Sequence, residues 1–236
     1  MKENMKSVLK EVFVTPEPER KKEFLQKIEQ PRISTFSFML LQISYIRKRV
    51  WIVSAFISCL AIMSAGYVGQ DCIWLISAMI PFIALCAVTE NARSAVYCMT
   101  ELEMSSRFSL KSITLARLSA IGLLHFMILC ILIPFVGKNA LLPFMRTAVY
   151  LVVPYLLTSV LGFVIARKMH GKEVIYVCMG IAVMVSLLIF IIKESIPELY
   201  GEKLFIWWCV VVIYLLVKAW SEFKKTISQT EELVWN

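Results

Sequence analysis

The residues that could perform chemistry in this chain are few and scattered. Its two histidines and seven cysteines do not have the spacing of a metal site, and there is no CxxC pair. The chain contains neither HExxH nor GxSxG, and neither of its two Gly-Lys pairs belongs to a phosphate-binding GxxxxGK[ST] loop. The sequence therefore predicts a non-enzymatic chain that binds no metal and no cofactor of its own.

Single polar residues near or within apolar runs indicate structural roles. For His125, an interhelical hydrogen bond is favoured over a proton relay or a metal ligand. Glu90 can pair with Arg93 one turn further on or with Arg117 across a loop, and either pairing would anchor that loop. Pro154 has no amide hydrogen, so it should kink its helix and free a backbone carbonyl.

The elements that carry these residues are apolar runs of membrane-spanning length. Of the 236 residues, 59% are hydrophobic and 18% are charged. About 20 apolar residues are needed for a helix to cross the hydrocarbon core of a bilayer. Six runs qualify and predict an all-α, polytopic membrane protein with six transmembrane helices, at roughly 50–67, 72–88, 118–136, 147–166, 174–192 and 204–220.

The lysine and arginine residues predict how the spans face, because basic loops stay in the cytoplasm. Most of the 25 basic residues fall on the side of both termini. We expect both termini to be cytoplasmic and the protein to lie in the plasma membrane. The net charge of +8 then reflects topology and an attraction for anionic lipid, and it does not indicate nucleic-acid binding. Only four basic residues fall on the outer side: Lys138, Arg146, Lys193 and Lys203.

We expect four parts along the chain. A cytoplasmic head carries two short apolar stripes, which must cover the membrane surface, the protein's own loops or a partner. An interfacial helix, the six-helix domain and a cytoplasmic tail follow. In chain order the four parts are 1–32, 33–49, 50–220, which includes a first cytoplasmic loop at 89–117, and 221–236.

The segment before the first span predicts an amphipathic helix in the cytoplasmic interface. It is closed by Arg47-Lys48-Arg49, which turns the chain into the first span. The alternative is a longer, tilted first span that begins near Phe36, but this would bring three cations to membrane depth. The predicted apolar face carries Phe36, Met39, Leu40 and Ile43.

The first cytoplasmic loop is longer than a hairpin between two spans requires. Leu102 and Met104 can enter an apolar groove, while charged residues around them form a polar rim, which is the anatomy of an interface. A break around Ser105-Ser106 separates two helical stretches. The pattern favours a docking element, and the alternative is a solvated loop without a partner.

These features together resemble the ABC type-2 permeases, the membrane subunits of ATP-binding-cassette exporters. The shared features are an interfacial helix, cytoplasmic termini, six spans and a helix-break-helix loop between spans two and three. The string at 101–111, which leads through Leu115-Ala116-Arg117 into span three, resembles the coupling-helix region of small bacterial permeases. The resemblance covers about 33–220. The chain departs from the family in two places. The head has no counterpart in the family, and the stretch 194–203 is too short for the usual re-entrant hairpin.

The resemblance implies a function and partners. Two permease subunits, identical or different, would pair in the membrane, and each would present a coupling helix to a separate ATPase subunit that binds ATP and Mg²⁺. The stretch 36–46 would be the elbow helix. The chain would move a substrate across the bacterial plasma membrane, with export expected. The ATPase-contacting residues would be Glu101, Leu102, Glu103, Met104, Arg107 and Phe108.

Two other classes of function compete with transport. A membrane-embedded sensor or scaffold could recruit a cytoplasmic regulatory protein through the head and the first loop, and it would need no ATPase. An intramembrane enzyme would need polar residues that converge at one depth, and only His125 with scattered serine and threonine residues is present.

Overall fold

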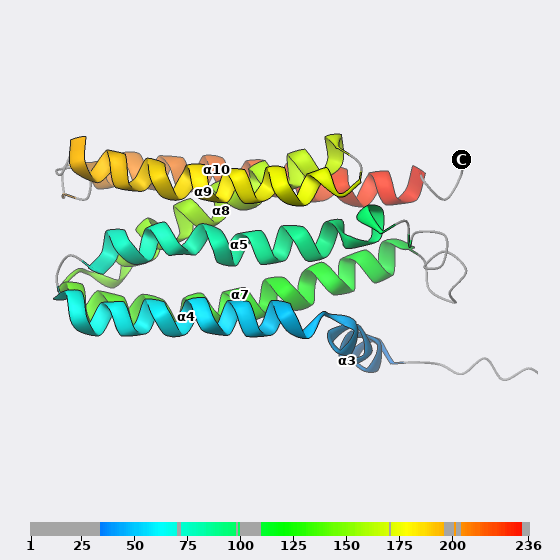
Figure 1. Cartoon of the computed structure of the whole chain (residues 1–236), viewed down its shortest axis with the longest axis horizontal. Coiled ribbons are helices and arrows are strands. Elements are labelled where there is room, and N and C mark those ends of the chain that lie inside the picture. The colour runs from blue at the N-terminus through cyan, green and yellow to red at the C-terminus, as the bar shows by residue number, and fades with distance from the viewer. Residues whose placement is uncertain are drawn as a thin grey trace, which may run out of the picture. The chain divides into compact units, whose positions relative to one another are not determined.

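The computed structural model describes residues 34–69, 72–97, 99, 110–169, 171–195, 201 and 204–232. Within these residues every regular element is a helix (Figure 1). The helices are α3 (Thr35–Tyr45), α4 (Lys48–Val68), α5 (Cys72–Val96), α7 (Leu110–Ala140), α8 (Phe144–Lys168), α9 (Glu173–Ser195) and α10 (Phe205–Glu232).

Six of these helices are long and apolar enough to cross a membrane, which confirms the six predicted spans. Their ends differ from the predicted ones, because the hydrogen-bonded backbone continues past the last apolar residue. α7 begins at Leu110 rather than at 118, and α10 continues through most of the predicted tail. Gly137-Lys138-Asn139 falls outside the predicted span 118–136, but it lies inside α7, where the side-chain amide of Asn139 donates to the Phe135 carbonyl at 2.9 Å.

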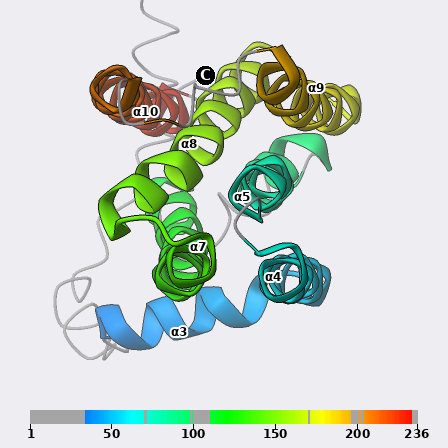
Figure 2. The ribbon, with the colours of Figure 1, turned by 90° about the vertical axis from the view of Figure 1, so that its left-hand side faces the viewer.

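Helices α5 and α8 form the centre of the bundle. α5 packs against α4, α7, α8 and α9, while α8 packs against α5, α7, α9 and α10 (Figure 2). The two central helices approach closely at Gly162 of α8. A Cβ atom on Gly162 would lie 2.6 Å from Cγ2 of Val88 on α5, so this position requires glycine.

Pro154 lies inside α8, and the carbonyl that it frees has found a partner on α5. Proline has no N–H to donate to the carbonyl four residues earlier, which is that of Tyr150. The Ser77 hydroxyl of α5 donates to this carbonyl at 3.0 Å, and both residues are buried. The contact ties α5 to α8 and confirms that Pro154 frees a carbonyl.

Replacing Ser77 with alanine is expected to lower the free energy of unfolding by about 1 kcal/mol, because the Tyr150 carbonyl loses the hydrogen bond from Ser77 in an apolar surrounding. Pro154→Ala supplies a backbone donor to the same carbonyl, so the loss caused by Ser77→Ala should be smaller in the double variant. Unfolding of the four proteins in detergent measures the coupling. Strictly additive effects would contradict this assignment.

Candidate functional site at the junction of α3, α5 and α7

The residues expected to contact an ATPase, which fall within 101–108, lie outside the described residues, as does the head. The two helix ends that flank this segment are described. α5 ends at Val96 and α7 begins at Leu110. The candidate site is therefore the junction that these two ends form with α3.

Helix α3 is separate from α4. The chain turns at Ile46 and Arg47, where Arg47 has an extended backbone (φ −59°, ψ 132°) and precedes α4. Figure 1 shows α3 nearly end-on while the spans are seen lengthwise, and Figure 2 shows α3 lengthwise while α4 and α7 are seen end-on. α3 therefore lies across the bundle, and Phe36 does not begin one long first span.

The face of α3 that packs on the bundle coincides only in part with the predicted apolar face. Phe38 is buried against Ile113 and Ala116 of α7. At the end of α3, Ile46 packs with residues of α4, α5 and α7, among them Cys86 and Ile121. α3 therefore contacts the first turns of α7, which is one of the two helices that flank the 98–109 segment.

The predicted apolar face is divided between packed and exposed positions. Ile43 and Met39 are half-buried, and Ile43 packs beside Ile46. Leu40 is 51% exposed, and its neighbours Leu41 and Tyr45 are also exposed. The side chain of Phe36 lies outside the described residues. α3 thus has one face on the protein and an exposed apolar face that could contact lipid.

A partly buried ion pair near the end of α5 is linked by a hydrogen bond to the end of α3. Oε1 of Glu90 lies 2.9 Å from Nη1 of Arg93, and Glu90 is only 3% exposed. The same Nη1 donates to the Tyr45 carbonyl at 3.2 Å. Because Tyr45 is the last residue of α3, its carbonyl has no partner within that helix. The positive charge of Arg93 also interacts favourably with the negative end of the α3 dipole. The predicted Glu90–Arg93 pair is present, and it anchors α3 as well as α5.

A second contact links the α3–α4 turn to the residue just beyond α5. The guanidinium carbon of Arg47 lies 4.7 Å from the ring centroid of Tyr97. A side-chain hydrogen bond with Arg47, together with its positive charge, lowers the pKa of Tyr97 from its ordinary value near 10. Sequence reasoning missed this contact, since Arg47 and Tyr97 are far apart in the chain. Arg117, the other predicted partner of Glu90, is buried on α7.

His125 makes interhelical hydrogen bonds, as predicted. It is fully buried on α7, with Nδ1 3.2 Å from the Tyr155 hydroxyl of α8 and Nε2 3.5 Å from the Ser54 hydroxyl of α4. Its ring also meets that of Tyr155 edge-on. The imidazole therefore joins three spans within an apolar core. In the part of the chain that the structure describes, no three His, Cys, Asp or Glu residues are grouped to hold a metal ion.

Sequence reasoning also missed a charged cluster that joins α8 to α10. Glu222 is buried, with Oε2 3.0 Å from Nη2 of Arg167 and Oε1 2.9 Å from Nζ of Lys225. The contact with Arg167 is an ion pair without hydrogen-bond alignment. Glu222 and Lys225 are three residues apart, a spacing that predicts an ion pair if the helix continues beyond residue 220. The cluster shows that α10 packs as one helix across the predicted start of the tail.

The comparisons with known proteins give no relative: no family model, no curated protein and no solved structure matches the chain.

Proposed function

We propose that the chain is the membrane subunit of an ATP-driven transporter, a permease of the ABC type-2 kind. A separate ATPase subunit would hydrolyse ATP, and this chain would move a substrate out across the bacterial plasma membrane. The proposal rests on the resemblance of the 101–111 segment and of the span arrangement. The structure adds six helices of spanning length, with α3 lying across them.

The observation that carries the proposal is that α3 is attached to both helices that flank the 98–109 segment. Arg93 of α5 bonds to the Tyr45 carbonyl of α3, and Phe38 of α3 packs on Ile113 of α7. A protein that pushes on the segment would therefore act on three helices together. A partner shifts a conformational equilibrium only through contacts that differ between its states, and these attachments would carry such a shift from the segment to α3.

The proposed contact residues are Glu101, Leu102, Glu103, Met104, Arg107 and Phe108. Leu102 and Met104 would enter a groove of the ATPase, and the charged residues would form its rim. A second permease subunit would complete the assembly in the membrane. The exposed side of α3, with Leu40, Leu41 and Tyr45, would contact lipid at the cytoplasmic surface.

Aspartate at both Leu102 and Met104 should abolish recovery of the ATPase with the tagged, detergent-purified chain, because two charges would be buried without partners in an apolar groove. Ser105→Asp with Ser106→Asp is the matched control, since it adds the same charge to the segment and keeps both apolar side chains. Immunoblotting of membranes checks that both variants insert. Mass spectrometry identifies the recovered subunits.

Three results of this purification would contradict the proposal. The wild-type chain could bring down no ATPase, or the Leu102 and Met104 variant could retain it. Recovery of a regulatory protein without a phosphate-binding loop would favour the sensor or scaffold function.

A further inference from the structure

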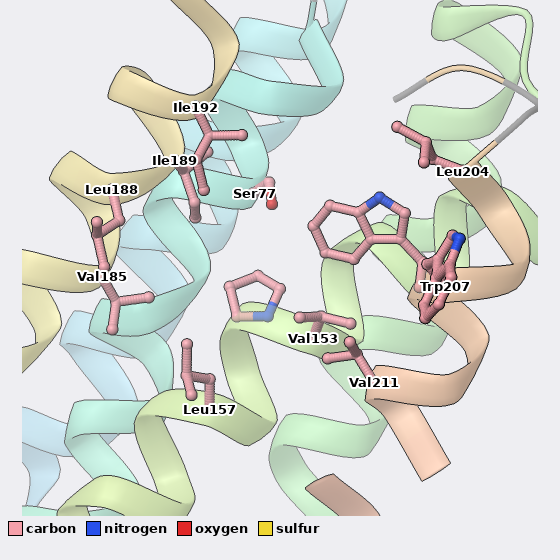
Figure 3. Close-up of a pocket in the computed structure, with 12 residues that line it drawn as sticks. Ser77, Val153, Leu157, Val185, Leu188, Ile189, Ile192, Leu204, Trp207 and Val211 are labelled. Carbon is pink, nitrogen blue, oxygen red and sulfur yellow. The ribbon is translucent and has the colours of Figure 1, made fainter. Parts of the chain in front are cut away.

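A cavity of about 340 Å³ lies between α8, α9 and α10, with α5 behind it (Figure 3). Val153 of α8 lies between a wall formed by α9 and a wall formed by α10. The volume is within the range of small-molecule sites in proteins. The lining residues are Ser77, Val153, Pro154, Leu157, Val185, Leu188, Ile189, Ile192, Leu204, Trp207, Trp208 and Val211.

The lining selects an apolar occupant. Apart from the two indole rings, Ser77 is the one lining residue with a polar side chain, and its hydroxyl is already donated to the Tyr150 carbonyl. An ordered water needs two to four polar partners, and the cavity does not offer that set. Filling the cavity with hydrocarbon restores the dispersion contacts that an empty space would lose.

The cavity is open to the side of the bundle that would meet lipid. α9 and α10 both pack on α8, but they do not form a packed pair with each other. Side chains at the mouth are accordingly exposed: Leu188 by 47%, Val211 by 41% and Trp207 by 68%. A molecule in the membrane could therefore enter between α9 and α10 without passing through water.

The cavity lies in the half of the bundle away from α3, next to the end of α9 and the starts of α5 and α10. Ile192 is in the last turn of α9, and Lys193 follows it with its ammonium 3.4 Å from the Trp74 ring centroid. Beside the α10 wall, the guanidinium of Arg146, near the start of α8, lies 6.0 Å from the ring centroid of Phe205, the first residue of α10. Each apolar wall thus ends beside a cation at the level expected for lipid headgroups.

We propose that this cavity binds one acyl chain of a phospholipid from the adjacent leaflet, with the lipid phosphate near Lys193 and Arg146. Under the predicted topology this is the outer leaflet. The apolar lining, the lateral opening and the cations at one end match the three parts of such a molecule. The proposal does not depend on transport and holds for any function of the chain.

Native mass spectrometry of the full chain purified in mild detergent tests the proposal. Val211→Phe and Leu188→Phe place a ring in the cavity from α10 and from α9. Val210→Phe and Leu187→Phe are their matched controls, since these neighbours are similarly exposed and do not line the cavity. We expect the wild type and both controls to carry one phospholipid that both cavity-filling variants lose.

A wild type without bound phospholipid, or filling variants that retain it, would overturn the proposal. The mass of the extracted molecule separates a phospholipid from any other amphiphile, and another amphiphile would also overturn it. If the filling variants do not fold, the wild type alone decides. A phospholipid with a photoreactive acyl chain should then label 185–192 and 204–211 in preference to the exposed face of α4, and labelling in proportion to exposure would contradict the site.

Discussion

Replacing Gly162 with leucine is expected to lower the free energy of unfolding by about 3 kcal/mol, a large effect for one substitution. Even the Cβ of alanine would lie 2.6 Å from Cγ2 and 2.8 Å from Cγ1 of Val88. Val88 is 1% exposed and β-branched, so its side chain has neither room nor rotamer freedom to move away. The clash would separate α5 from α8, the two central helices.

Gly162→Ala separates this clash from the general cost of glycine in a helix. Alanine is about 1 kcal/mol more favourable than glycine in a helix interior, which acts against the clash. At Gly122 and Gly180 a new Cβ meets nothing within 4 Å, so alanine should stabilise the protein there. At Gly162 we expect the opposite sign, because overpacking of a filled core typically costs about 1–3 kcal/mol.

Unfolding of the three alanine variants in detergent measures whether each substitution raises or lowers the free energy of unfolding. Val88→Ala combined with Gly162→Ala should recover part of the loss, because it removes both methyl groups that cause the clash. A Gly162→Ala protein as stable as the Gly122→Ala protein would show that α5 and α8 do not approach each other as described.

The six spans could be predicted because the number of apolar residues needed to cross a bilayer is a local property of the sequence. The helix ends could not be predicted from the apolar runs, since a helix continues past the last apolar residue wherever its backbone remains hydrogen-bonded. α7 starts eight residues before the predicted third run for this reason. Gly137-Lys138-Asn139 contains typical turn residues, but the side-chain amide of Asn139 donates to the Phe135 carbonyl within the helix instead.

The packed face of α3 could not be chosen from the sequence, because apolar residues occur on every side of this helix. Phe38 and Leu41 are as apolar as Met39 and Leu40, so periodicity alone does not select the face that meets α7. The structure places Phe38 inside and leaves Leu40 exposed.

The candidate site was predictable only where its contacts are local. Glu90 and Arg93 are one helical turn apart, and their pairing follows from that spacing. The bond from Arg93 to the Tyr45 carbonyl spans 48 residues, and no sequence pattern indicates it. The six contact residues within 101–108 stay a prediction from resemblance.

Replacing Arg93 with alanine is expected to loosen α3 from α5 and to lower the free energy of unfolding by about 3 kcal/mol. The side chain of Glu90 is 4% exposed, so its carboxylate would be left buried without the cation that pairs with it. The Tyr45 carbonyl would lose its donor at the same time. Hydrogen exchange of the α3 amides measures the loosening, and unfolding in detergent measures the stability.

Glu90→Gln separates the two contributions. Glutamine removes the buried charge, so Arg93→Ala should cost much less in a Glu90→Gln background than in the wild type. α3 should still exchange faster in the double variant, because the Tyr45 carbonyl remains without its donor. Lys48→Ala is the matched control, since it removes an exposed cation at the start of α4 and should leave α3 unchanged.

The Arg93→Ala variant also distinguishes a role of Arg93 in attaching α3 from a role in binding the ATPase. If the junction transmits motion, Arg93→Ala should still recover the ATPase with the chain, because the 101–108 segment is intact, while substrate movement per ATP hydrolysed falls. Loss of the ATPase itself would place Arg93 in the docking surface. Unchanged exchange of the α3 amides would show that the bond to Tyr45 does not hold α3, and the junction would then carry no mechanical role.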